Sequence, residues 1–266
     1  MSWWGKLIGG TFGYMLGGPL GAVLGAAMGH NFDKGMRRLG ADGRLGSGDQ
    51  ERVQAAFFAA TFSVMGHMAK ADGRVSPTEI AAAKAVMAHM SLSPEMKKAA
   101  IRLFDEGKKS DFPLEEALAQ FRRECHRRRT LVQMFVEIQL QAAYADGQMH
   151  EAEWQLLLHI CKQLGISSFE FERLDAMAQA AWQHARREGA EPSSKTTLTE
   201  AYAILSIDKD ASDTEVKRAY RRLMSQHHPD KLVAKGLPEE MIELAKQKTQ
   251  EIRKAYEEVK ERRGMR

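Results

Sequence analysis

The sequence contains very little cysteine. Cys125 and Cys161 are the only two cysteines among 266 residues. Two thiols cannot form a disulfide framework or a zinc site of four cysteines, which excludes those classes of small stapled domain. A zinc ion would require both thiols to converge with His126 and His159, which the sequence does not favour. A reducing compartment is therefore the simpler expectation for the bulk of the chain.

The chain also lacks a strong excess of charge of either sign. It carries 39 lysine and arginine residues against 35 aspartate and glutamate residues, a formal net charge of +4. So small an excess creates no general field for polyanions, and we expect no nucleic-acid partner. Convincing strands are missing too, because no run alternates apolar and polar residues, whereas helical spacing continues from Glu51 onward. The expected fold class is therefore all-α.

One long apolar run interrupts this otherwise polar sequence. Residues 7–29 form 23 positions without a charge. As a helix they would be about 34 Å long, enough to cross a bilayer core of about 30 Å. A cleaved signal peptide is the alternative, but the run is too long for the apolar part of one and offers a poor cleavage site. We therefore predict an uncleaved, single-pass transmembrane anchor within residues 1–32, held in the lipid bilayer.

The flanking charges predict the orientation of this anchor. One lysine precedes the run, whereas four cations follow it: Lys34, Arg37, Arg38 and Arg44. By the positive-inside rule, residues 33–266 lie in the cytoplasm and a short N-terminal tail lies outside.

Small residues form one face of the predicted anchor. Glycine recurs at every fourth position, and residues four apart share a face of a helix. The series consists of Gly9, Gly13, Gly17, Gly21, Gly25 and Gly29. Such a smooth groove lets two membrane helices approach backbone to backbone, so we predict a homodimer through the transmembrane helix. The groove also fits packing against another membrane protein.

Composition divides the rest of the chain into four segments. Residues 33–50 are glycine-rich and polar and indicate a juxtamembrane linker. Residues 51–185 are predicted to form one all-α domain of six or seven helices. Residues 186–196 are charged and small and indicate a second linker, after which residues 197–266 form a compact unit.

The all-α domain contains a weak internal repeat. The stretch "ADGRVSPTE" at 71–79 matches "ADGQMHEAE" at 145–153, and each copy would end one helix and begin the next. These elements resemble the TerB-like helical domain linked with tellurite resistance, for which metal binding through acidic loops has been suggested. The resemblance makes Asp72, Glu79, Asp146 and Glu153 candidate metal ligands. Turn chemistry alone is favoured, because two carboxylates per loop are few for an oxygen-ligated cation.

The C-terminal unit is organised around an abrupt helix end. Residues 216–226 have the apolar spacing of an amphipathic helix, preceded by a capping box at Ser212. The stretch "SQHHPDK" stops this helix, since Pro229 cannot continue it and biases His228 toward an extended conformation. A second helix is predicted from Pro238, so the two helices form an antiparallel hairpin with His228-Pro229-Asp230 at or near its tip.

Three stretches of this unit, "AYAILSI", "EVKRAYRRLMSQHHPDK" and "QEIRKAYEEV", resemble the J-domain of DnaJ-type co-chaperones. The resemblance covers about residues 197–262 and departs at Ser206, where the family usually has glycine. It implies that the unit binds the ATP state of a DnaK-type chaperone and stimulates its ATP hydrolysis, without a cofactor or enzymatic chemistry of its own. The DnaK-binding residues are then His228, Pro229, Asp230, Lys217, Arg218, Arg221, Arg222 and Lys231.

The order of the parts adds a further resemblance. An anchor, a TerB-like domain and a J-domain together resemble the membrane-anchored DnaJ-like proteins of Gram-negative bacteria. This implies a protein of the inner membrane, with its N-terminus in the periplasm, that recruits DnaK to the cytoplasmic face. It also implies a membrane signalling partner and a link to envelope stress and capsule synthesis. The alternative function is a metal-binding or metal-stress protein acting through the TerB-like acidic loops.

Overall fold

The computed structural model describes residues 47–71, 77–88, 90, 92–144, 147, 149–190 and 197–265. All regular secondary structure in these residues is helical, which confirms the predicted all-α fold class. The predicted anchor, with its glycine series, lies outside the described residues. Within the described segments, no helix combines the length and the apolar character needed to cross a bilayer.

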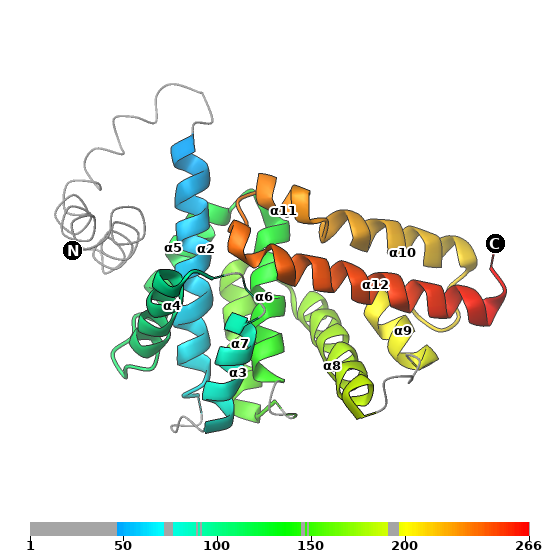
Figure 1. The fold of residues 1–266 in the computed structure, drawn as a ribbon, viewed down its shortest axis with the longest axis horizontal. Coiled ribbons are helices and arrows are strands. Elements are labelled where there is room, and N and C mark those ends of the chain that lie inside the picture. The colour runs from blue at the N-terminus through cyan, green and yellow to red at the C-terminus, as the bar shows by residue number, and fades with distance from the viewer. Residues whose placement is uncertain are drawn as a thin grey trace.

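The helices form a larger N-terminal bundle and a smaller C-terminal part (Figure 1). The bundle consists of α2 (Ser47–Met68), α3 (Pro77–Ala88), α4 (Pro94–Gly107), α5 (Leu114–Cys125), α6 (Arg129–Ala143), α7 (Glu151–Leu164) and α8 (Ser168–Ala190). The C-terminal part consists of α9 (Leu198–Leu205), α10 (Asp213–Gln226), α11 (Pro229–Ala234), the 3-10 helix η1 (Glu239–Met241) and α12 (Ile242–Arg263). Helix α8 thus extends into the first residues of the predicted linker 186–196.

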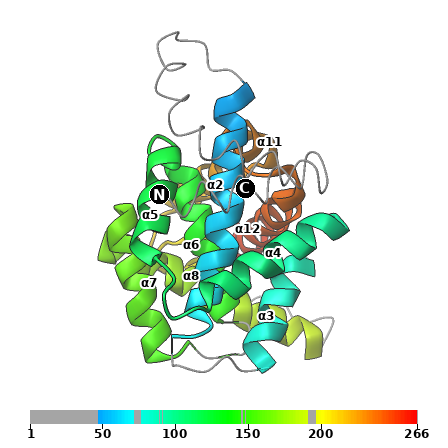
Figure 2. The same ribbon diagram turned by 90° about the vertical axis from the view of Figure 1, so that its left-hand side faces the viewer.

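Helix α2 runs through the middle of the bundle (Figure 2). The sequence pattern predicts one apolar face on this helix, but residues 55–66 are buried on every side. The reason is that α4, α5 and α6 all pack against α2, so that no face is left for solvent. The buried hydroxyls of Thr61 and Ser63 donate to the carbonyl oxygens of Phe57 and Ala59, at 2.8 and 2.7 Å.

Two glycines allow α2 and α4 to touch backbone to backbone. A Cβ atom on Gly66 would lie 2.0 Å from the carbonyl oxygen of Phe104, and one on Gly107 would lie 1.8 Å from that of Ser63. No side chain fits at either position while the helices keep this separation. The crossing therefore depends on glycine in both helices.

The C-terminal part has its own core. Helices α10 and α12 lie antiparallel, with α9 packed against α12 (Figure 1). Val216 and Leu223 of α10 share this core with Ile252 and Val259 of α12. The core also includes residues from α8 of the bundle, which shows that the two parts pack against each other there.

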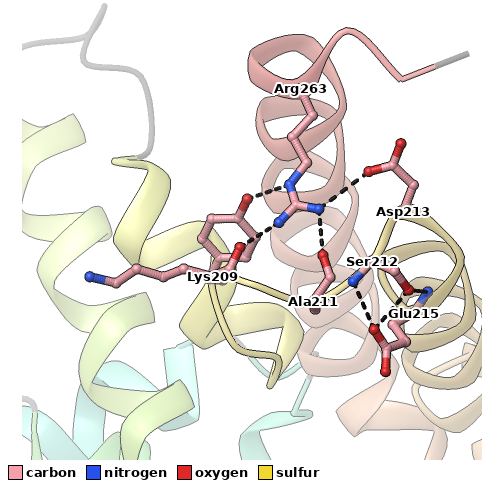
Figure 3. A network of polar contacts seen from close by, with 7 residues as sticks. Lys209, Ala211, Ser212, Asp213, Glu215 and Arg263 are labelled. Atoms are coloured by element: carbon pink, nitrogen blue, oxygen red, sulfur yellow. Dashed lines mark hydrogen bonds and ion pairs between the residues drawn. The ribbon is translucent and has the colours of Figure 1, made fainter.

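Polar contacts hold the beginning of α10 against the end of α12 (Figure 3). The predicted capping box is present: Ser212 N donates to the Glu215 carboxylate at 2.7 Å, and Glu215 N donates to Ser212 Oγ at 3.3 Å. Arg263, near the C-terminus, donates to the carbonyl oxygens of Lys209 and Ala211 and pairs with Asp213 at 3.2 Å. The loop before α10 is thereby tied to α12, so the hairpin is fixed at the end opposite the His-Pro-Asp turn.

Candidate functional site

The backbone changes direction between His227 and Pro229. Helix α10 ends at Gln226, and His228 adopts the extended conformation that the following proline favours, with φ −61° and ψ 123°. This confirms the predicted helix end. The next element was not predicted: Pro229 is the first residue of a short helix, α11. Proline suits that position, where a backbone N–H would have no partner within the helix.

The two adjacent histidines face opposite ways. His228 is exposed, whereas His227 is only 4% exposed and lies 3.6 Å, from Nε2 to Oε1, from Glu137 of α6. Burial lowers the pKa of His227, and the nearby Glu137 carboxylate offsets this only in part. His227 is therefore neutral at neutral pH. Its position, eleven residues after Val216, continues the apolar spacing of α10, and this signal could have predicted its burial.

The side chains of the turn itself point to solvent. His228 and Asp230 are exposed, and within the described part of the chain neither side chain forms a hydrogen bond or an ion pair. Lys231 is also exposed, but its Nζ donates to Ser225 Oγ at 2.7 Å and so folds back over the end of α10. The turn thus presents an imidazole and a carboxylate, both without partners among the described residues, on either side of a rigid proline.

A cationic surface leads to this turn. Arg218, Arg221 and Arg222 of α10 are exposed and Lys217 is half-buried. None of the four forms an ion pair with a carboxylate in the residues that the structure covers. Partial burial lowers the pKa of Arg222, and the positive charge of Arg173 on α8 adds to this effect. Cations on a rigid helix attract an acidic surface and steer its approach.

The candidate metal ligands of the acidic loops do not form a site in the described structure. Asp72 and Asp146 lie outside the described residues, as does the side chain of Glu79. Glu153 is buried and accepts a hydrogen bond from the backbone N–H of His150 at 2.9 Å, which makes it part of a capping box. Among the residues described, no three metal-ligating side chains of His, Cys, Asp or Glu gather together. The metal-binding alternative therefore gains no support.

The two cysteines are buried core residues. Burial raises the pKa of both Cys125 and Cys161 to about 12, so each remains a thiol. His159, two residues before Cys161 in α7, instead contacts the Glu115 carboxylate at 2.6 Å. His126 Nδ1 lies 2.7 Å from the carbonyl oxygen of Arg123.

Comparison with known proteins accounts for all three parts of the chain. The family model described as "Co-chaperone DjlA transmembrane domain" matches residues 1–41, "Tellurite resistance protein TerB" matches residues 58–176, and "DnaJ domain" matches residues 200–263. The C-terminal part is therefore a J-domain and the bundle is a TerB-like domain. The first match also supports the predicted membrane anchor.

Similar proteins span the whole chain. Co-chaperone protein DjlA of Photobacterium profundum is 44% identical, over 98% of this chain and 99% of that relative. The proteins of the same name from Vibrio cholerae and Shewanella oneidensis are 44% and 46% identical, and each match covers 100% of both chains. No solved structure matches the chain significantly.

Proposed function

Since the chain belongs to the DjlA family of co-chaperones, we propose that its J-domain binds the ATP state of a DnaK-type chaperone and accelerates ATP hydrolysis there. As a J-domain co-chaperone with a transmembrane domain, the protein is membrane-anchored and regulates a partner rather than catalysing a reaction. One observation above all supports the proposal that the J-domain binds the chaperone and accelerates ATP hydrolysis. His228 and Asp230 are exposed, and no described residue pairs with them at the end of a cationic helix.

The physical mechanism needs no covalent step. The cations of α10 steer the J-domain onto an acidic surface of the chaperone. Asp230 then accepts a charge-assisted hydrogen bond from a basic group, while Pro229 limits the freedom of the turn that carries it. Binding that favours the hydrolysing conformation of the partner acts as a coupling free energy between the two proteins.

The predicted membrane anchor also bears on where in the cell the protein acts. The cations after the apolar run support a cytoplasmic J-domain, and the glycine series supports a homodimer in the membrane. We propose that the protein recruits the chaperone to the cytoplasmic face of the inner membrane. There it would act on membrane-associated clients or on a signalling protein of the envelope stress response.

Single-turnover ATP hydrolysis tests the central claim. The full chain in lipid nanodiscs is titrated into a DnaK-type chaperone loaded with ATP, and the hydrolysis rate is measured. We expect Asp230→Asn to weaken stimulation by about tenfold or more, the usual loss for a hydrogen bond between charged groups. Asp210→Asn is the matched control, because Asp210 is an exposed carboxylate of the same domain, away from the turn. Equal stimulation by wild type and Asp230→Asn would contradict the proposal.

A further inference from the structure

The connection between α10 and α12 is packed into the TerB-like bundle. Leu232, Leu237 and Met241 of this connection are 0% exposed, and they belong to the same hydrophobic core as α2 and α6. Leu244 and Ala245, at the start of α12, join that core. Three fully buried apolar side chains that belong to the core of the bundle, and not to the J-domain's own core, indicate a docking element.

The backbone of the connection also lies directly against the bundle. Gly236 has φ +101°, and a Cβ atom there would lie 2.6 Å from Val53 Cγ1 of α2. Polar contacts flank this point: Lys235 Nζ donates to Thr130 Oγ1 at 2.8 Å, and Gln50 Nε2 donates to the Val233 carbonyl oxygen at 3.3 Å. The contact therefore combines apolar burial with specific hydrogen bonds to both α2 and α6.

One buried polar contact reaches the residue next to the functional turn. Glu137 of α6 lies 3.6 Å from His227, and both side chains are largely buried. The other charged groups that face His227 are Lys248 and Glu251 of α12, which are 3.4 Å apart. His227 Nδ1 and Glu137 Oε2 have no hydrogen-bond partner among the described residues. The bundle thus contacts the turn through the side chain that immediately precedes His228.

One side of the His-Pro-Asp turn packs against the bundle, and the opposite side is open to a partner. His227 and Leu232 face the bundle and are buried, whereas His228 and Asp230 face solvent. A partner can therefore reach His228 and Asp230 without displacing the connection from the bundle. We propose that the docked arrangement is the state that engages the chaperone, with the TerB-like domain as its scaffold and Glu137 as a positioning residue acting through His227. This inference rests on the proposed function.

A reversible cross-link tests whether the docked state is the active one. A Cβ atom on Gly236 would lie 3.1 Å from Val53 Cβ, and disulfides span about 3.5–4.5 Å between Cβ atoms. A small outward shift therefore lets Val53→Cys and Gly236→Cys join in the full chain. Val53→Cys with Gly165→Cys is the matched control, since Gly165 also has a positive φ but faces open space. The native thiols are buried and react slowly.

The expected result is that the oxidised chain cross-links and still stimulates ATP hydrolysis to within about twofold of its reduced form, a change smaller than typical allosteric couplings. Failure to cross-link, together with fast exchange of the Leu237 amide in the wild-type chain, would show that the domains do not dock in solution. Loss of stimulation on oxidation, with recovery on reduction, would show that docking blocks the chaperone. Either outcome overturns the inference.

Undocking provides the complementary test. Leu237→Asp places a carboxylate in the interdomain core, and we expect faster amide exchange in residues 232–241. We expect the co-chaperone concentration for half-maximal stimulation to rise about fivefold or more, the lower end of typical couplings. Ile101→Asp is the control, because Ile101 is 47% exposed on α4. Normal stimulation by an undocked Leu237→Asp chain would refute the inference.

Substitutions of Glu137 can distinguish a role in positioning the turn from a role in folding. We expect Glu137→Ala to raise the half-maximal concentration while leaving the maximal rate nearly unchanged, and Glu137→Gln, which keeps an acceptor oxygen, to restore it. Equal values for Glu137→Ala and wild type would remove the positioning role. Cross-linking and exchange report docking without any chaperone. A failure of the proposed function, seen as absent stimulation by wild type or full stimulation by Asp230→Asn, is therefore distinguishable from a failure of this inference.

Discussion

Gly236→Ala measures how tightly the connection is held against the bundle. The substitution has two costs. At φ +101° a side chain strains the backbone by about 1–2 kcal/mol. The new methyl group would also lie 2.6 Å from Val53 Cγ1, and overpacking of this kind costs about 1–3 kcal/mol.

Gly165→Ala isolates the first cost. Gly165 caps the C-terminal end of α7 at φ +77°, and a Cβ atom there would meet nothing within 4 Å. This substitution should therefore show strain alone. The excess cost of Gly236→Ala over Gly165→Ala is the part due to contact with α2. In a Val53→Ala background Cγ1 is gone and the nearest atom of residue 53 is its Cβ, at 3.1 Å. About 1 kcal/mol of coupling should then appear in the double-mutant cycle.

Native-state hydrogen exchange of the full chain in detergent micelles measures local stability near both Gly236 and Gly165. The Leu237 amide, bonded to the Leu232 carbonyl oxygen at 2.9 Å, reports the connection. The Ile166 amide, bonded to the Cys161 carbonyl oxygen at 2.8 Å, reports the control site. A loss of 2 kcal/mol in local opening free energy speeds exchange by about 30-fold. If Gly236→Ala lowers local stability no more than Gly165→Ala does, the close contact with α2 is absent in solution.

Two further predictions concern stability. Gly107→Ala should destabilise the bundle by more than about 4 kcal/mol, because the Cβ would lie 1.8 Å from the Ser63 carbonyl oxygen. In an open helix the same change gains about 1 kcal/mol, so an unchanged denaturation midpoint would disprove the backbone crossing. Below about pH 6.5, stability should fall with decreasing pH, because the depressed pKa of His227 means that the unfolded chain binds more protons than the folded chain. His227→Gln should flatten this slope in denaturation series at pH 5 to 7, and a slope identical to that of wild type would contradict the assignment.

The local features of the J-domain were predictable because each depends on neighbours in sequence. Ser212 and Glu215 are three residues apart, and Pro229 acts on His228 through a shared peptide bond. The docking of the connection was not predictable in this way. Leu237 lies in a loop without helical periodicity, and its burial depends on contacts with helices more than 90 residues earlier in the chain.

Helix α2 shows a second limit on predicting burial from the sequence. The sequence pattern predicts one apolar face on α2, whereas residues 55–66 are all buried. Burial on all sides depends on how many helices pack around α2, and the sequence of α2 alone does not reveal how many do. The glycine series of the anchor and the acidic residues Asp72 and Asp146 lie outside the described residues, so their roles stay predictions.

The contact between Gln50 and Val233 shortens the path from the bilayer to the functional turn. These residues are 183 positions apart in the chain, yet they share a hydrogen bond of 3.3 Å. From Gly29, the predicted end of the membrane segment, to Gln50 the chain can reach at most about 75 Å. A chaperone bound at the turn would therefore be held near the membrane surface. Tension on the anchor would act on α2 and would reach the connection through this contact and through the contact of Gly236 with Val53.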